Sequence, residues 1–212
     1  VMKAQKDMEF RDILNKADLK IPDGVGLIWA INKTFHPGME CKYKCERVAG
    51  VDVMLGLCKL AVEKKWRVYF LGGEKLVAKK AAEKLRNKYL GLKIKGSMGL
   101  EKIDKATKQE NTKMINKINK YKPDLLFVGF GHGKQEKWIV KNLAKLQIKV
   151  AMGVGGSFNY LVKPWLRAPK LVQKIGLEWL WRLVLQPWRI KRQIELVKFV
   201  GLVLKGSETG RI

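Results

Sequence analysis

The stretch Asp-Leu-Leu-Phe-Val-Gly-Phe-Gly-His-Gly-Lys-Gln-Glu, residues 124–136, is the most informative about architecture. Its apolar run over residues 124–128 predicts a buried strand, because short apolar runs bounded by turn residues are typical of such strands. The glycine-rich turn after it leads into residues 135–146, whose pattern predicts a helix. A strand, a glycine turn and a helix in this order indicate part of a βαβ unit.

The same order recurs on both sides of this stretch. We expect strands over residues 66–71, 92–95, 124–128 and 148–152, and helices over residues 2–17, 25–31, 51–65, 74–89, 104–121 and 135–146. Strands that alternate with helices of this length are typical of α/β proteins. The sequence therefore predicts a Rossmann-like, mostly parallel sheet flanked by helices. Residues 32–46, which contain Pro37 and Gly38, are expected to form a loop.

The last part of the chain has a different composition. Residues 160–212 hold 11 Lys and Arg against three Glu, a net charge of +8, and four of the seven tryptophans. Apolar residues follow helical spacing over residues 177–188, and a second basic amphipathic stretch covers residues 190–204. Pro187 is expected to end or kink the first of these helices.

These differences in composition predict that the chain has two structural parts. We expect a Rossmann-like catalytic body over residues 1–160 and a basic, tryptophan-rich helical appendage over residues 161–212. The chain opens with residues of polar, helical character, so we expect no signal peptide. For the same reason we expect an upstream strand to be missing from this sequence.

The net charge argues against an indifferent surface. The 212 residues carry 44 Lys and Arg against 19 Asp and Glu, which gives a formal net charge of +25. An anionic partner is expected: nucleic acid, phospholipid head groups or a phosphorylated substrate. A lysine-rich surface that is merely solvated is the alternative. The hydrophobic fraction of 47% is enough for a core, which excludes wholesale disorder.

Cysteine usage indicates neither disulfides nor a metal. Three cysteines, Cys41, Cys45 and Cys58, are too few for a disulfide framework. His36 with Cys41 and Cys45 could be drawn as a metal site, but the spacing is loose and no fourth ligand is evident. We therefore expect reduced thiols and no metal. No uninterrupted apolar run reaches the roughly 18 residues of a membrane-spanning helix.

Glycines follow three of the predicted strands. They are Gly72, Gly73, Gly129, Gly131, Gly155 and Gly156. Ligands of parallel sheets bind beyond the carboxyl ends of the strands, where these glycines are expected to lie. They match neither G-x-G-x-x-G nor the P-loop pattern. Two interpretations stay open: tight turns between strand and helix, or backbone N–H groups presented to a phosphate.

Candidate side chains flank these glycines. Asp23, beside Gly24, is either a turn residue or a carboxylate at a strand end that takes a proton from an attacking hydroxyl. Gln135 and Glu136 either cap the helix that follows or, in the case of Gln135, bind a base or sugar edge through the side-chain amide. Pattern alone does not choose between these interpretations.

Three arginines lie on the basic appendage: Arg182, Arg189 and Arg192. The spacing of seven places Arg182 and Arg189 on one face only if the helix continues past Pro187. A solvated face is one interpretation, and a bidentate clamp on phosphate oxygens is another. A third is an interfacial helix on anionic lipid, because tryptophans are interleaved with the charges. Nucleic acid would use the same groups, but no RNA- or DNA-binding motif is evident, so we expect no nucleic-acid partner.

An ordered set of motifs resembles the WecG/TagA/CpsF glycosyltransferase family, in particular its TagA-like N-acetylmannosaminyltransferases. The set consists of Asp23-Gly24, Arg47-Val-Ala-Gly-Val-Asp52, Phe70-Leu-Gly-Gly73, Gly129-Phe-Gly-His-Gly-Lys-Gln135-Glu136-x-Trp138, Gly153-Val-Gly-Gly-Ser-Phe158, Arg167-Ala-Pro169, Leu177-Glu-Trp-Leu-x-Arg182 and Pro187-x-Arg189. The resemblance covers nearly the whole chain, and the order of the motifs is more specific than any one of them.

The resemblance implies an inverting, metal-independent enzyme without a cofactor. It would move N-acetylmannosamine from UDP-ManNAc to the C4 hydroxyl of GlcNAc on undecaprenyl diphosphate, the step that makes the linkage unit of wall teichoic acid. The implied partners are a UDP-sugar donor, a lipid-linked diphosphate-GlcNAc acceptor and an anionic membrane surface, with a homo-oligomer as a further option. The implied location is cytoplasmic, peripheral on the inner face of the bacterial membrane.

The resemblance also implies roles for single residues. Asp23 matches the family's proposed general base, and Arg47 matches a pocket arginine near the substrate phosphates. Gln135 and Glu136 match the donor-pocket motif. The three appendage arginines match residues thought to close over the active site and hold the diphosphate.

Departures and alternatives accompany the resemblance. The family usually carries a Thr and Asn motif on a strand that this sequence lacks, and it usually has Asp where Asn159 stands. Asn159 cannot act as a base. Three alternative functions stay open: a family transferase that uses another UDP sugar, a family member that binds without catalysing, and a basic nucleic-acid-binding module on a Rossmann-like body.

Overall fold

The computed structural model describes residues 1–34, 46–73, 76–100 and 103–208. Contacts divide the chain into two compact units. The sheet unit comprises Asp12–Lys16 and Gly50–Pro164, and the helical unit comprises Val1–Arg11, Ala17–Ala49 and Trp165–Ile212. Each unit is described separately below.

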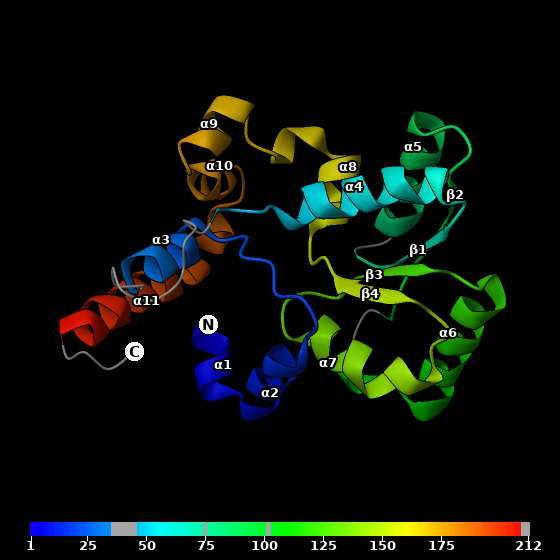
Figure 1. Ribbon diagram of the computed structural model, residues 1–212, viewed down its shortest axis with the longest axis horizontal. Helices are drawn as coiled ribbons and strands as arrows, with labels where there is room; N and C mark the ends of the chain where they lie inside the picture. Colours follow the sequence, from blue (N-terminus) through cyan, green and yellow to red (C-terminus); the bar gives the residue numbers. More distant parts are fainter. Residues whose placement is uncertain (35–45, 74–75, 101–102, 209–212) are drawn as a thin grey trace. The chain divides into compact units, whose positions relative to one another are not determined.

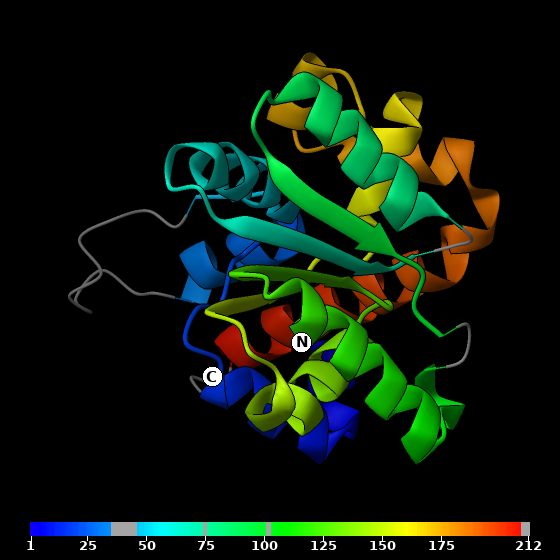
Figure 2. The same cartoon turned by 90° about the vertical axis from the view of Figure 1, so that its right-hand side faces the viewer.

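Four strands form one parallel sheet in the sheet unit (Figure 2). They are β1 (Arg67–Gly72), β2 (Lys93–Ser97), β3 (Leu125–Gly129) and β4 (Val150–Gly153), in the order β2-β1-β3-β4. This arrangement confirms the predicted α/β fold with a parallel sheet. From β1 the chain crosses to β2 on one side, whereas from β3 it crosses to β4 on the other. The direction of winding therefore changes between β1 and β3.

Helices cover both faces of this sheet (Figure 1). One face carries α4 (Gly50–Glu63), α5 (Val77–Lys88) and α8 (Ser157–Val162), and the other carries α6 (Lys108–Tyr121) and α7 (Lys134–Asn142). Short 3-10 helices, η1 (Ile103–Lys105) and η2 (Leu143–Lys145), precede α6 and follow α7. The predicted helix over residues 135–146 thus ends early, and its last turn tightens into η2.

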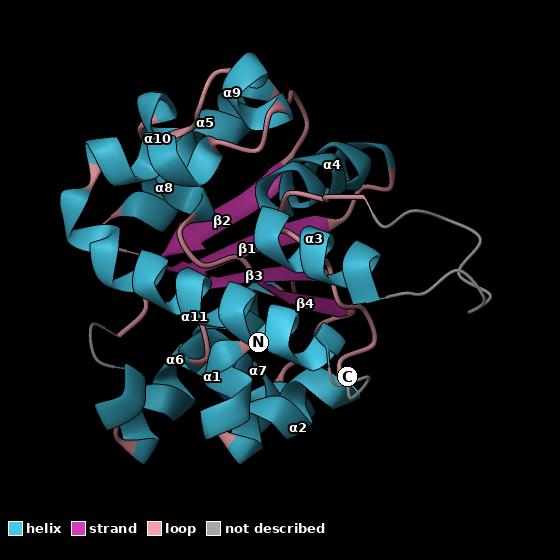
Figure 3. Ribbon diagram, turned by 90° about the vertical axis from the view of Figure 1, so that its left-hand side faces the viewer, coloured by secondary structure: helices cyan, strands magenta, loops and turns pink. Residues whose placement is uncertain are grey.

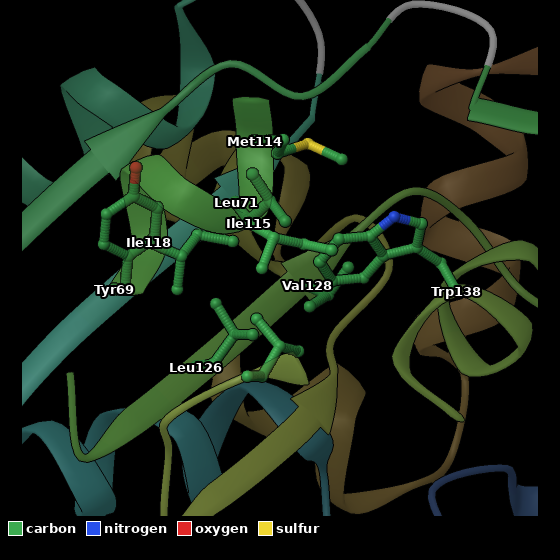
Figure 4. Packing of buried hydrophobic residues seen from close by; sticks show 9 residues of the cluster. Tyr69, Leu71, Met114, Ile115, Ile118, Leu126, Val128 and Trp138 are labelled. Carbon is green, nitrogen blue, oxygen red and sulfur yellow. The ribbon is translucent and has the colours of Figure 1, made fainter. Parts of the chain in front are cut away.

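Alternate residues of the central strands build two cores. Side chains of β1 and β3 on one face pack against α6 and α7 (Figure 4). They are Tyr69, Leu71, Leu126 and Val128, against Met114, Ile115, Ile118 and Trp138. On the other face, the Phe70 ring stacks on Phe158 at 4.5 Å between centroids and meets Phe127 edge-on at 5.6 Å. Strand side chains alternate between faces, and burying each large one stabilises the fold by about 1.5–3 kcal/mol.

Asp124 ties the amino ends of three strands together. Its Oδ2 accepts a hydrogen bond from the Arg67 N–H at 2.8 Å, and its Oδ1 pairs with Lys149 Nζ at 2.8 Å. Its carbonyl accepts from the N–H groups of Lys149 and Val150. One residue at the start of β3 therefore fixes the starts of β1 and β4.

The helical unit contains α1 (Met2–Lys6), α3 (Val25–Thr34), α9 (Lys170–Lys174), α10 (Glu178–Leu185) and α11 (Ile190–Glu208). The 3-10 turn η3 (Pro164–Leu166) precedes α9, and the 3-10 turn η4 (Pro187–Arg189) lies between α10 and α11. Helix α3 lies beside α11 (Figure 3). A Cβ on Gly26 would lie 2.8 Å from Leu196 Cδ1, so a glycine lets the two helices approach closely.

Two expectations differ from the structure, and the one for Pro187 is confirmed. Asp7, with φ −128°, interrupts the helix predicted over residues 2–17 and separates α1 from α2 (Met8–Lys16), whose Phe10 N–H donates to Asp7 Oδ1 at 3.0 Å. As expected, the helix ends before Pro187, which lacks the N–H that a continuous helix needs, so the condition for Arg182 and Arg189 to share one helical face is not met. Residues 17–49 group with the C-terminal helices, not with the sheet, because α3 packs on α11.

Candidate active site

The carboxyl edge of the sheet brings the predicted glycines together. Gly72, the last residue of β1, pairs directly with Gly129, the last residue of β3. The Gly73 N–H donates to the Gly129 carbonyl at 2.9 Å, just beyond the strands. Open parallel sheets bind ligands where the winding direction changes, outside the carboxyl ends of the strands. The pair therefore lies at the edge of the sheet unit where a ligand is expected.

Two of these glycines allow other parts of the protein to approach the backbone closely. A Cβ on Gly72, which has φ +97°, would lie 2.8 Å from the Phe130 ring. A Cβ on Gly129 would lie 2.9 Å from the Gly155 carbonyl oxygen and from Phe158 Cε2. Phe130 in turn meets Trp138 edge-on at 5.5 Å. The absence of side chains at Gly72 and Gly129 thus serves packing.

Two others border open space. Gly131 has φ +90° and Gly155 has φ +51°, and a Cβ built on either would meet nothing within 4 Å. Glycine at these two positions allows a backbone with positive φ, which residues with an L side chain rarely adopt. A Cβ on Gly73, which has φ +81°, would make only ordinary van der Waals contacts. Gly156 is exposed and directly precedes α8. Room for a ligand at this edge is therefore next to Gly131 and Gly155.

Gln135 links the start of α7 to the turn after β4. Its Oε1 accepts from the Gly155 N–H at 2.9 Å, and its Nε2 donates to Glu136 Oε1 at 2.8 Å. Only 4% of the residue is exposed. Both ends of the amide are engaged within the protein, so Gln135 holds the Gly155 turn in place. Its predicted contact with a donor stays a prediction.

Glu136 caps α7. Its Oε2 accepts from the Gly133 N–H at 2.7 Å, while the Lys134 and Gln135 N–H groups point to the Gly131 carbonyl. A carboxylate at a helix N-terminus is favoured by the helix dipole. The interpretation of Glu136 as a helix cap is confirmed. Its carboxylate occupies the position where a phosphate would meet this helix N-terminus.

Asn159 stands on the first turn of α8. Its Oδ1 is buried and has no hydrogen-bond partner in the described part of the chain. An unmet buried acceptor costs about 1–3 kcal/mol, so a donor from a ligand would be favourable there. Asp at this position would place a charge where Asn159 places a neutral amide.

In the helical unit, Arg47 connects Asp23 to Glu178. Its Nε donates to the Asp23 carbonyl at 2.7 Å, and its Nη2 lies 3.3 Å from Asp23 Oδ1 and 2.8 Å from Glu178 Oε2. The Val48 N–H donates to the Pro22 carbonyl at 3.1 Å, which aligns the two segments. One of the two interpretations of Asp23 placed it at a strand end, but residues 17–24 contain no strand and the residue precedes α3.

The electrostatics of this cluster divide it into a buried and an exposed end. Side-chain exposure is 10% for Glu178, 25% for Arg47 and 57% for Asp23. Burial alone would lower the pKa of Arg47, but the hydrogen bond and charge of Glu178, and then Asp23, raise it above its usual value. The guanidinium is thus a permanent cation, and the Asp23 carboxylate beside it is open to solvent.

Glu178 was not predicted as a site residue. It begins α10, and only 7% of the residue is exposed. One signal was available: a lone carboxylate in the apolar run Leu177-Glu-Trp-Leu-Trp181 is expensive to bury unless a cation meets it. The sequence does not say which of the 44 cations does so.

The structure locates the appendage arginines on successive elements. Arg182 lies on α10 with its Nε buried, Arg189 ends η4, and Arg192 lies in the first turn of α11. The side chains of Arg189 and Arg192 lie outside the described part of the structure. Their predicted phosphate contacts stay predictions.

Apolar side chains are exposed on the same elements and on η3. Exposure reaches 62% at Trp165, 40% at Trp179 and 72% at Trp188, and Val184 and Val197 are similarly open. Trp181 donates its ring N–H to the Trp165 carbonyl at 3.2 Å. None of the described helices is long and apolar enough to cross a bilayer.

The metal expectation concerns residues that are partly outside the described ranges. His36, Cys41 and Cys45 lie outside them. Within the described ranges, His, Cys, Asp and Glu form no group of three or more that could hold a metal ion. Burial raises the pKa of the Cys58 thiol to about 12, so this cysteine stays protonated.

Comparisons with known proteins agree with the motif order. The family model for the glycosyl transferase WecG/TagA/CpsF family matches residues 1–211. A Bacillus subtilis (strain 168) protein named N-acetylglucosaminyldiphosphoundecaprenol N-acetyl-beta-D-mannosaminyltransferase is 32% identical over 95% of this chain and 74% of its own length. A protein of the same name from Staphylococcus aureus (strain MRSA252) is 28% identical over 93% of this chain and 73% of its own length.

Proposed function

Because the chain belongs to the glycosyl transferase WecG/TagA/CpsF family, we propose that it transfers N-acetylmannosamine from UDP-ManNAc to GlcNAc-diphospho-undecaprenol. The names of its relatives in Bacillus and Staphylococcus describe this transfer. The product would be the disaccharide linkage unit of wall teichoic acid. The structural observation that carries the proposal is the solvent-open Asp23 carboxylate oriented by Arg47.

Asp23 is the proposed general base. Its carboxylate takes the proton of the GlcNAc C4 hydroxyl as that oxygen attacks C1 of N-acetylmannosamine. The bond from C1 to the diphosphate oxygen breaks, UDP leaves with the bonding electron pair, and the configuration at C1 inverts. Arg47 holds Asp23 through both the backbone carbonyl and the carboxylate, which keeps the base in one orientation.

The donor is proposed to bind at the carboxyl edge of the sheet unit. The Gly131 and Gly155 turns provide the open space, and the winding change between β1 and β3 is the usual location. The Gly133 N–H already donates to Glu136, so other groups must balance the negative charge of the donor's diphosphate. Gln135 supports this edge by holding the Gly155 N–H.

The diphosphate groups are proposed to meet arginines. Arg182, Arg189 and Arg192 offer guanidinium groups that bond phosphate oxygens in a bidentate manner. Protein cations can stabilise the charge that develops on leaving UDP, as a metal ion would in a metal-dependent enzyme. We therefore propose a metal-independent reaction.

The C-terminal elements are proposed to dock on the inner face of the bacterial membrane. Tryptophans and aliphatic side chains are exposed on η3, α10 and η4, and the segment carries net charge +8. Aromatic side chains partition to the membrane interface, and each basic residue near an anionic leaflet contributes about 1 kcal/mol. A lipid-linked acceptor would be presented at such a surface.

A donor panel tests the proposal. The purified chain is incubated in EDTA with a water-soluble GlcNAc-diphospho-lipid analogue and UDP-ManNAc, UDP-GlcNAc or UDP-glucose, and both UDP and disaccharide product are measured. We expect acceptor-dependent UDP release with UDP-ManNAc alone. Turnover with another sugar would overturn the donor assignment, turnover only after magnesium is restored would overturn metal independence, and UDP release without a disaccharide would overturn transfer.

A further inference from the structure

A cavity lies at the opposite edge of the sheet from the glycine turns. Its volume is about 490 Å³. The residues that line it are Arg67, Arg86, Leu92, Lys93, Ile94 and Tyr121. Arg67 and Lys93 are the first residues of β1 and β2, so the cavity lies at the amino ends of these strands.

This location separates the cavity from the proposed donor site. Gly72 ends the strand that Arg67 begins, and a strand rises roughly 3.3 Å per residue, so the two sites lie about 16 Å apart along β1. Both belong to the sheet unit. The cavity is therefore not an extension of the glycine edge.

Cations dominate the lining, and the structure holds two of them in place. Arg86 Nη2 donates to the Ile94 carbonyl at 2.5 Å. The Arg67 guanidinium lies 4.4 Å from the centroid of the Tyr121 ring, and Lys95 Nζ lies 5.7 Å from the same ring. Cation–π contacts of this kind orient a guanidinium without neutralising its charge.

No carboxylate lines the cavity within the described part of the chain. Asp124, the acidic residue next to Arg67 in the sheet, directs Oδ2 to the Arg67 backbone N–H and Oδ1 to Lys149. Two arginines and a lysine thus line one hollow, and a bound anion would relieve their mutual repulsion.

We propose that this cavity binds a water-soluble compound bearing a phosphate or diphosphate group. Guanidinium forks match phosphate oxygens in a bidentate manner, and lysine adds a mobile point charge. The cavity volume falls within the range of about 300–1,000 Å³ that is common for small-molecule sites. The site goes beyond the proposed transferase reaction and does not depend on it.

The test follows Tyr121 by NMR, because the ring lies inside the site. The full chain is labelled with ring-¹³C tyrosine, and Tyr121→Phe identifies the Tyr121 signal. Inorganic diphosphate is titrated in the presence of saturating UDP, which occupies a donor site if there is one. We expect a saturable shift of the Tyr121 signal, with affinity at least fivefold weaker in Lys93→Gln and in Arg86→Gln.

The control is Lys59→Gln, which removes an equal charge from the exposed face of α4. Its affinity for diphosphate is expected to stay within twofold of the parent. Equal weakening in Lys59→Gln and Lys93→Gln would show that net charge alone attracts diphosphate, and this would overturn the site. An unmoved Tyr121 signal, or one that moves only with phosphatidylglycerol vesicles, would overturn it as well. UDP release in the donor panel is independent of each of these results.

Discussion

Arg47 Nη2 lies 2.8 Å from Glu178 Oε2, although the two residues are 131 positions apart in the chain. The pair joins the segment before α4 to the first turn of α10, within the helical unit. The same guanidinium reaches Asp23. Glu178 therefore positions the arginine that positions the proposed base, without itself facing solvent.

Glu178→Gln is expected to lower turnover more than it lowers stability. The amide can still accept a hydrogen bond from Arg47, but the charge that fixes the guanidinium is lost; hydrogen bonds to charged groups contribute about 1.5–3 kcal/mol. We expect at least a fivefold fall in kcat with KM for the donor little changed. Glu195→Gln, which removes an exposed carboxylate 3.5 Å from Lys198, serves as the control. Equal kcat in both variants would contradict a positioning role.

Asp23→Asn is expected to reduce transfer by about 10²–10⁴-fold, the usual effect of losing a general base. Folding and UDP binding should persist, because the Arg47 Nε bond goes to the backbone carbonyl, which the substitution keeps. The measurement is UDP release on the soluble acceptor, alongside thermal unfolding. Asp18→Asn changes another exposed aspartate on the same segment and should be active. If Asp23→Asn retains a third of parental activity, Asp23 is not the base.

The two roles of the C-terminal elements are expected to separate by residue. Arg189→Ala should cut turnover at least tenfold on a soluble diphosphate acceptor, because a bidentate phosphate contact is lost. Lys198→Ala should weaken binding to anionic liposomes and leave that turnover within twofold, because it removes a surface charge 56% exposed on α11. Parental turnover of Arg189→Ala with weakened liposome binding would mean that the segment is an anchor only.

Acid is expected to destabilise the sheet unit in part through Asp124. The hydrogen bond from Lys149, and then the one from the Arg67 N–H, hold the pKa of Asp124 below its usual value. A carboxyl whose pKa is lower when folded stabilises the fold above its unfolded pKa of about 3.9, and this contribution is lost as pH falls through the folded pKa. The Tm difference between parent and Asp124→Asn should therefore be largest near pH 6 and shrink toward pH 3. A difference that is constant over this range would exclude the charge as its source.

Local patterns were sufficient for the architecture of the sheet unit. The runs around Phe70 and Phe127 became buried parallel strands, since apolar runs bounded by glycine report burial on both faces. The run around Met152 became the partly exposed parallel strand β4 at the edge of the sheet. The position of Gly72, Gly129 and Gly155 at one edge followed as well, because parallel strands end on the same side of a sheet. The family assignment rested on the order of motifs, which is likewise a property of the chain.

Relationships between distant residues needed the folded chain. Phe130 fills the space over Gly72, Gln135 accepts a hydrogen bond from the Gly155 N–H, and Arg47 pairs with Glu178. These are three pairings among the many that the composition allows. Periodicity reports which face of an element is buried, whereas the partner on that face depends on how separate elements pack. A buried carboxylate in this sequence could be expected to find a cation, but only packing selects Arg47, since it brings that guanidinium within hydrogen-bonding distance.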